Sequence, residues 1–360
     1  MTTGNETIEN NIELEIIPSE DIDAESDTAR YKINTYGADY TLEILSKKID
    51  DKEIIIPSFQ RRYVWSIKKA SKLIESFLLG LPVPQIFLYR EEDTQDLLVV
   101  DWQQRLKTIN FFFKGVFDSS VVFKLTGVWA EWEGKTFNDL SLVDKRKLNN
   151  YILRSNIFEQ TDPQDKSSIF EIFERLNTGG MALNTQEVRN CVIRGDINDF
   201  LQELNNYSNW RTILNKLQPD ARMKDIEMLL RFFALYEKRD QYKKPMKDFI
   251  TNFMTERKNI DENTKKRYRD IFFKTIDLLI NNIWERPFRI KGGINIAVYD
   301  SVMIAVTTLE PKDIPNLKTN YDKLIKEPQY KENTSEWTTN NERVKSRIDI
   351  AINYLKTWNL

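Results

Sequence analysis

Three polar segments of the sequence combine cationic and amide side chains in patterns suited to holding a phosphate. They are Gln60, Arg61 and Arg62 within IPSFQRRYVW, the five residues 101–105 directly after the apolar run LLVV, and RLNTGGMALNTQEVRN at 175–190. The guanidinium fork matches a phosphate, amides bond phosphate oxygens, and helix N-termini present unpaired N–H groups that favour anions. A fold that joined these segments would therefore form a phosphate-binding crevice.

The chemistry open to this chain is limited, because its 360 residues include no histidine. An HNH site, a HEXXH site and a Ser-His-Asp triad are excluded, since each needs the side chain that titrates near neutral pH. Any catalysis must then rest on carboxylates, amides, Lys and Arg. Asp101 is the acid that could hold Mg²⁺ or position a water, the two tasks of phosphoryl hydrolysis without histidine.

A purely structural interpretation competes for each segment taken singly. Asp101 with Gln104, and Asn184 with Glu187, have the spacing of capping boxes at helix N-termini. Paired glycines after a helix are ordinary C-caps, and an Arg pair beside aromatic residues can form cation–π contacts at the surface. Only the three segments together favour a binding site.

The second segment is predicted to lie at a junction from a strand to a helix. QIFLY at 85–89 and LLVV at 97–100 indicate a hairpin, and a helix follows Asp101 and ends at Gly115. The buried face of this helix is expected to consist of Leu106, Ile109 and Phe113.

Further elements are expected along the same region. VVFKL at 121–125 and VWAEWEG at 128–134 indicate a second hairpin, and Ser141 is expected to cap a helix. YILRSNIF at 151–158 has the composition of a strand, and KSSIFEIFERLN at 166–177 has the spacing of a helix.

The sequence predicts an α+β fold of two domains behind a short leader. Residues 1–30 are acidic, with no Lys or Arg before Arg30, and are expected to be flexible. Residues 31–197 mix strand and helix patterns, and residues 198–360 are mainly helical. The helical domain shows four apolar stripes, at 226/229/230/233, 272/276/279/283, 298/302/305/309 and 344/348/351/355.

Composition excludes several classes of protein. Lys and Arg total 53 against 55 Asp and Glu, which disfavours wholesale DNA coating but leaves local basic patches open. Cys191 is the single cysteine, so no intrachain disulfide or cysteine zinc cluster can form, as suits a reducing compartment. No apolar run is long enough for a bilayer and the N-terminus is acidic, so we expect a cytoplasmic protein without membrane contact.

Four motifs in order, IPSFQRRYVW, LLGLPVPQIFLY, VVDWQQRL and FERLNTGGMALNTQEVRN, give the chain a family resemblance. Between about residues 35 and 195 it resembles the ParB/sulfiredoxin-like domain of the GmrS half of GmrSD type IV restriction enzymes, also found in the phage-defence proteins SspE and BrxU. The resemblance implies a ParB/sulfiredoxin-like fold. It also implies a module that binds and hydrolyses a nucleoside triphosphate (NTP) and so regulates cleavage of modified or foreign DNA.

The resemblance implies two groups of site residues. The catalytic group matches the family's DGQQR motif, with Asp101 organising Mg²⁺ or water, and consists of Asp101, Gln103, Gln104 and Arg105. The second group binds the nucleotide and its phosphates. Gln60 and Arg61 match the family's FQR motif, and the RLNxGG loop is matched by Arg175, Asn177, Gly179 and Gly180. Two neighbours of the motif residues, Arg62 and Trp102, complete this group. Within it, Arg61 joins Arg105 in holding phosphates.

One position departs from the family motif, because Trp102 stands where DGQQR has glycine. Glycine allows unusual backbone dihedrals and close approach of a ligand, whereas tryptophan adds a large ring. Three interpretations compete: the indole faces the core and the site survives, it stacks on a base, or it fills the pocket and hydrolysis is lost. Pocket impairment ranks slightly ahead, because glycines beside phosphates rarely have spare room.

The leading hypothesis is a nucleotide-binding regulatory component of an anti-phage or restriction system. The nuclease of such two-part systems is an HNH domain, which a chain without histidine cannot contain, so a separate nuclease subunit is the implied partner; a homo-oligomer is left open. The alternative is a non-enzymatic DNA-sensing module that uses the same crevice on the phosphate backbone. Direct nuclease activity ranks lowest, because no nucleophile or two-metal carboxylate pair is evident.

Overall fold

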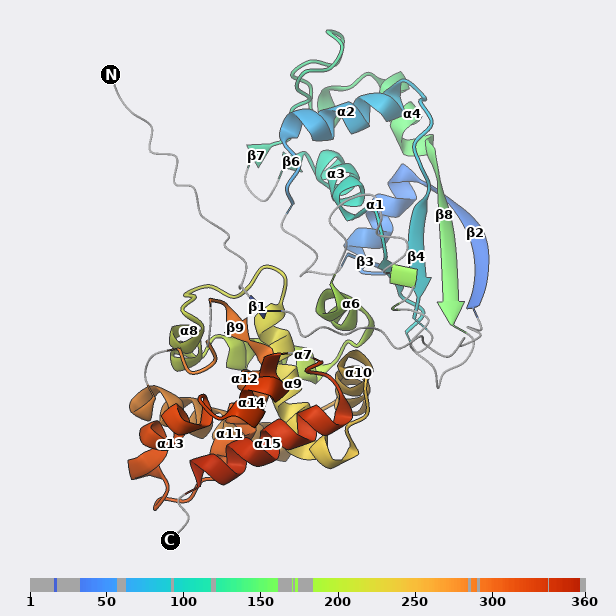
Figure 1. Cartoon of the computed structure of the whole chain (residues 1–360). Helices are drawn as coiled ribbons and strands as arrows, with labels where there is room; N and C mark the ends of the chain where they lie inside the picture. Colours follow the sequence, from blue (N-terminus) through green and yellow to red (C-terminus); the bar gives the residue numbers. More distant parts are fainter. Residues whose placement is uncertain are drawn as a thin grey trace, which may run out of the picture. The chain divides into compact units, whose positions relative to one another are not determined.

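The computed structural model of the chain separates into two compact units, residues 30–191 and residues 192–360 together with 1–29 (Figure 1). It describes residues 16–17, 33–56, 63–91, 94–117, 121–160, 170, 172–173, 184–283, 286–289, 292–335 and 337–356. Within those ranges, no helix combines the length and apolarity needed to cross a bilayer.

The first unit is built on a mixed five-stranded sheet with the order β2-β8-β4-β5-β3. The strands are β2 (Ile33–Thr41), β3 (Ile54–Ile55), β4 (Ile86–Arg90), β5 (Leu97–Val99) and β8 (Ile152–Gln160). β2 and β4 run antiparallel to β8 and β5 respectively, whereas β4 with β8 and β3 with β5 are parallel pairs. The predicted hairpin at 85–100 is confirmed, with Leu88 opposite Val99.

Four helices lie on one side of this sheet (Figure 1). They are α1 (Leu42–Asp50), α2 (Ile67–Leu78), α3 (Gln103–Lys114) and α4 (Leu142–Asn150). The predicted cap of α4 is confirmed, since the Ser141 hydroxyl accepts a bond from the Asp144 N–H at 3.1 Å. Gly115 ends α3 in the left-handed region, at φ 72°. Leu106 and Ile109 of α3 are fully buried as predicted, but Phe112 takes the buried place expected for Phe113.

The second predicted hairpin is wrong. Val121–Val122 (β7) pairs with Val116–Phe117 (β6) and not with residues 128–134. That segment forms turns instead, because it is arranged to bury one ring: Trp132 is 2% exposed and stacks on Trp129 at an interplanar angle of 9°. A strand would have pointed the indoles at positions 129 and 132 to opposite faces.

The second unit is mainly helical, as predicted. Its helices are α7 (Asp196–Asn205), α8 (Ser208–Leu214), α9 (Lys224–Lys238), α10 (Met246–Glu256), α11 (Glu262–Asn282), α12 (Ile296–Thr307), α13 (Leu317–Leu324), α14 (Pro328–Ser335) and α15 (Asn341–Leu355). The four predicted stripes fall on or at the end of α9, α11, α12 and α15 and are buried. Of the expected leader, Ile16–Ile17 (β1) is described; it pairs in parallel with Ile294–Asn295 (β9).

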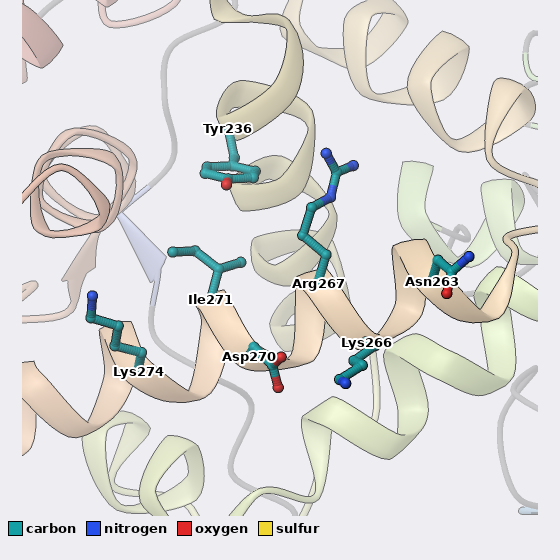
Figure 2. Close-up of a pocket in the computed structure, with 7 residues that line it drawn as sticks. All are labelled: Tyr236, Asn263, Lys266, Arg267, Asp270, Ile271 and Lys274. Carbon is teal, nitrogen blue, oxygen red and sulfur yellow. The ribbon is translucent and has the colours of Figure 1, made fainter.

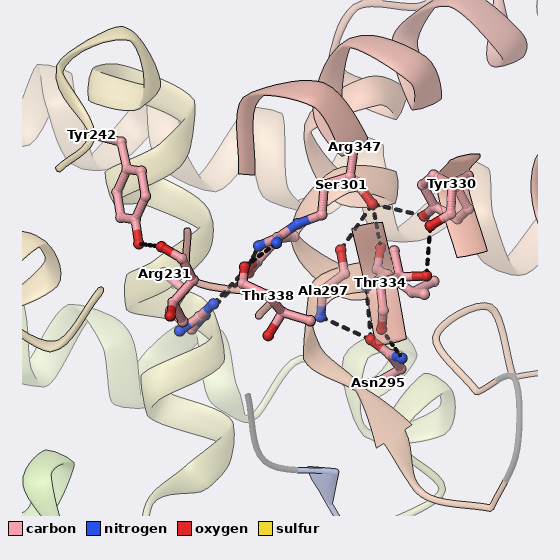
Figure 3. Close-up of polar contacts among 12 residues, drawn as sticks. Arg231, Tyr242, Asn295, Ala297, Ser301, Tyr330, Thr334, Thr338 and Arg347 are labelled. Atoms are coloured by element: carbon pink, nitrogen blue, oxygen red, sulfur yellow. Dashed lines mark hydrogen bonds and ion pairs between the residues drawn. The ribbon is translucent and has the colours of Figure 1, made fainter. Parts of the chain in front are cut away.

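Helix α12 is the centre of this unit, because every residue from Ile296 to Val306 is buried. The helix carries one buried charge, Asp300, whose carboxylate accepts hydrogen bonds from two arginines on neighbouring helices, Arg231 and Arg347 (Figure 3). Arg231 of α9 donates to it at 3.1 and 2.6 Å, and Arg347 of α15 donates at 2.9 Å. Arg347 also bonds the carbonyl of Thr338. The network ties three helices together, with two cations on one carboxylate.

Candidate phosphate-binding site

The second polar segment begins in the connection between β5 and α3. Val100, just past the end of β5, donates its N–H to the Phe87 carbonyl at 3.0 Å, and α3 begins at Gln103. The strand-to-helix junction predicted from LLVVDWQQRL is therefore confirmed. Asp101 and Trp102 form the connection, and both lie between elements that are anchored in the core.

The capping box predicted at Asp101 and Gln104 is wrong. Trp102, one residue later, is the N-cap of α3, and no side chain caps it. The Asp101 carboxylate instead accepts the N–H of Trp102 at 2.7 Å. The Gln104 side-chain oxygen accepts the N–H of Val64 at 2.9 Å, from a segment 40 residues earlier. The left-handed backbone at Trp102, φ 84°, moves the start of the helix one residue later. The side chains of Asp101 and Gln104 therefore bond other partners.

Trp102 lies with its ring in the core and Arg105 above it. The indole is 6% exposed and belongs to the hydrophobic cluster that includes Leu106 and Ile109. The guanidinium carbon of Arg105 lies 3.6 Å from the ring centre, a close cation–π contact. The first of the three interpretations of Trp102, an indole facing the core, describes this placement.

Arg105 has an unused donor. Its Nη1 atom is buried and has no hydrogen-bond partner among the residues that the structure describes. Burial lowers the pKa of Arg105, and the nearby charge of Asp101 raises it in part. Arginine nevertheless stays protonated in proteins, so the group presents a positive charge with a free N–H. A buried cationic donor of this kind favours an anionic acceptor.

The residues that follow the first polar segment are fixed to α3. The Tyr63 hydroxyl and the Thr108 hydroxyl are 2.6 Å apart, and Val64 contacts Gln104 as described above. Tyr63 also packs edge-on against Phe111. The predicted site residues Gln60, Arg61 and Arg62 lie outside the described residues. Tyr63 is their immediate neighbour in sequence, and its contact with Thr108 was not evident from local patterns because the partners are 45 residues apart.

The third segment is described from Asn184 onward, and its predicted capping box is confirmed. The Asn184 side chain accepts the N–H of Glu187 at 2.8 Å, and the Glu187 carboxylate accepts the N–H of Asn184 at 2.7 Å. Helix α6 (Thr185–Val192) follows, and within it Arg189 donates to Gln186 at 2.7 Å. The predicted residues of the loop lie outside the described residues: Arg175, Asn177, Gly179 and Gly180.

Comparison with known families was informative for the first unit. Residues 42–194 match the family model of the GmrSD restriction endonuclease, N-terminal domain. This part of the chain is a GmrSD N-terminal domain. No curated protein matches the chain. The matched range begins at the first residue of α1 and ends two residues after α6, so the GmrSD domain contains all three polar segments.

The described part of the GmrSD domain offers few protein ligands for a metal ion. Among the residues that the structure describes, no group of three or more His, Cys, Asp or Glu side chains is placed to hold a metal ion. A Mg²⁺ ion bound through substrate phosphates needs one or two carboxylates from the protein. Asp101 at the start of α3 suits that smaller requirement.

Proposed function

We propose that the GmrSD domain of this chain binds an NTP together with Mg²⁺ and hydrolyses it, and that the nucleotide state regulates a restriction system acting on modified or foreign DNA. The membership of residues 42–194 in the GmrSD family supports the restriction context. The nucleotide role depends on the chemistry of the junction between β5 and α3.

The observation that carries the proposal is the unpartnered Nη1 of Arg105. Leaving a buried polar donor unpaired costs about 1–3 kcal/mol, and more for a charged group. The Arg105 guanidinium is held on the Trp102 ring, so it is oriented and partly desolvated before any ligand arrives. A phosphate oxygen is the acceptor that would best use this donor.

Asp101 is the second participant in the proposal. Its carboxylate is oriented by the Trp102 N–H at 2.7 Å, and its charge acts on Arg105. In the proposed complex, Asp101 would be the protein ligand of Mg²⁺, and the ion would supply charge neutralisation on the phosphates. Asp101, through Mg²⁺, and Arg105, directly, would therefore bind the same phosphate group.

The position of the indole supports a competent site. Because the Trp102 ring lies in the core cluster, it does not take the space of a ligand in front of Arg105. We therefore infer that Trp102 replaces the backbone freedom of the family glycine with an aromatic support for Arg105. This favours survival of the site over the pocket impairment that ranked first on the sequence alone.

A partner completes the proposed system. Since these 360 residues contain no histidine, an HNH nuclease of the system would lie outside them, for example on a separate subunit. The GmrSD domain would then act on it through its nucleotide state, either as a single copy or as a homo-oligomer.

Equilibrium binding of a labelled NTP in the presence of Mg²⁺ tests the proposal. Arg105→Ala is expected to weaken binding roughly 10-fold or more, the loss typical of a hydrogen bond to a charged group. Arg90→Ala is the matched control: Arg90 also lies over an aromatic ring, Tyr36, in the same domain. It is at the opposite end of the β4–β5 pair, opposite Leu97. Equal binding by wild type and the Arg105 variant would overturn the assignment.

A further inference from the structure

The helical unit carries a basic groove outside the GmrSD domain. It has a volume of about 430 Å³ and lies between α9 and α11 (Figure 2). Its lining combines three cations with an aromatic ring, an apolar side chain, an amide and one acid: Lys266, Arg267, Lys274, Tyr236, Ile271, Asn263 and Asp270. This mixture differs from an ordinary solvated helix face, because the cations stand beside a ring and an amide.

Two of these cations have no acidic partner. Lys266 and Lys274 are exposed, and neither forms an ion pair within the described part of the chain. The other cations of α11 are paired: Lys265 with Glu262, Arg267 with Glu237, and Arg269 with Glu203. Asp270 lies four residues from each lysine in the same groove, so the two lysines leave it a net positive charge.

The spacing of the two lysines points to a ligand with more than one anionic group. They are eight residues apart, so their Cα atoms are separated by roughly 12 Å along the helix axis. Both ammonium groups would reach a single phosphate only if the two side chains bent toward each other along the helix. Lys266 and Lys274 would therefore contact two different phosphates of a chain that follows α11.

The wall opposite the cations suits a nucleobase. The Tyr236 ring is half-buried and stands over Ile271, with Arg267 and Lys274 to either side in Figure 2. The ring also packs on Phe232, at a ring-centre distance of 6.1 Å. Asn263, near the start of α11, adds an amide at the other end of the groove. An aromatic platform beside a cationic track is the arrangement by which proteins hold single strands.

We propose that the groove between α9 and α11 binds a single-stranded nucleic acid, with Lys266 and Lys274 on its phosphates and Tyr236 stacked on a base. An acidic peptide would use the lysines but not the ring. A duplex would present phosphates but keep its bases stacked inside. The single strand is the ligand that uses both features. This site is independent of the NTP site proposed in the GmrSD domain.

Fluorescence anisotropy with a labelled oligodeoxythymidylate and the full 360-residue chain tests this site. Affinity should fall with salt, with a slope of about 0.7 per phosphate contact in a single strand. Lys266→Ala with Lys274→Ala is expected to reduce the slope by about 1.4, the sum of two such contacts. Lys323→Ala with Lys326→Ala is the matched control, because both lysines are exposed, unpaired among the described residues and outside the groove.

The ring is tested separately. Tyr236→Leu is expected to weaken binding roughly 5-fold or more, whereas Tyr236→Phe should keep it, since stacking needs the ring and not the hydroxyl. Three results would each overturn the proposal: a salt slope unchanged in the double lysine variant, a duplex of the same length that binds as tightly, or polyglutamate that competes as well as the oligonucleotide. Arg105→Ala should leave this binding unchanged, so failure here and failure of the NTP proposal are distinguishable.

Discussion

The guanidinium carbon of Arg105 lies 3.6 Å from the centre of the Trp102 ring, at the first turn of α3. The same tryptophan has a left-handed backbone, with φ 84°, and a side chain that is 6% exposed. Trp102 adopts a strained backbone conformation, but its ring fills the core and supports the Arg105 cation. It therefore links the stability of the domain to the geometry of the proposed site.

Trp102→Gly is expected to lower both stability and NTP binding. Removing a buried indole costs about 3–5 kcal/mol, and relief of the left-handed backbone returns about 1 kcal/mol. Chemical denaturation should therefore show a net loss of roughly 2–4 kcal/mol. NTP turnover is expected to fall, because Arg105 loses its support. If NTP turnover by Trp102→Gly rose above that of the wild type, the indole would instead obstruct the pocket. Trp102→Phe keeps a ring, so its stability and turnover should lie between those of the wild type and Trp102→Gly.

Asp300→Asn is expected to destabilise the helical unit. The substitution leaves Arg231 and Arg347 buried without their shared counter-charge, and breaking a buried ion pair typically costs about 3–5 kcal/mol. Asp322→Asn is the control, since Asp322 pairs with Lys318 at the exposed surface and should change stability by at most about 1 kcal/mol. Thermal or urea unfolding measures both. Equal effects of the two substitutions would show that the network in Figure 3 is not a structural centre.

The raised pKa of Tyr207 predicts a loss of stability at high pH. Burial and a hydrogen bond to Asp277 raise the pKa of Tyr207 from 10.0 to about 12. The folded state therefore favours the neutral phenol, a contribution fully present below pH 10 and lost as pH rises through about 12. Tyr207→Phe should flatten the pH dependence of unfolding in that window. If the wild type and the variant lose stability in parallel between pH 10 and 12, the hydroxyl is not the titrating group.

Salt dependence separates the two uses of the Arg105 crevice. A nucleotide held by one or two cations should lose little affinity between low and moderate salt. A DNA backbone that contacts several phosphates should lose affinity with a slope of about 0.9 per contact. We expect shallow dependence for NTP, measured by filter binding across a salt series. If DNA binding instead showed a steep salt dependence that Arg105→Ala removes, DNA sensing by this domain would be favoured.

Local patterns were sufficient for most of the fold. Ser141 and Gly115 predicted the ends of their helices because capping acts within one turn. The hairpin at 85–100 followed from two apolar runs around a polar turn. The four stripes of the helical unit predicted α9, α11, α12 and α15, since burial of one face sets a helical period.

The failures came from tertiary contacts. Residues 101–104 have the spacing of a capping box, but burial of the indole places Trp102 at the N-cap and frees Asp101 and Gln104 for other partners. Residues 128–134 have the composition of a strand, but they fold into turns around the buried ring of Trp132. The contact between Val64 and Gln104 spans 40 residues and has no local signal. Assembly of a site from distant segments therefore exceeds what spacing can predict.

Photoaffinity labelling with an NTP that carries a photoreactive group on its γ-phosphate is the sharpest test of whether the three polar segments meet at one phosphate. We expect labelled peptides from residues 60–65, 101–105 and 175–190, with labelling that unlabelled NTP competes away and that Arg105→Ala abolishes. Labelling that spares all three segments, or that persists unchanged without the Arg105 side chain, would contradict this expectation.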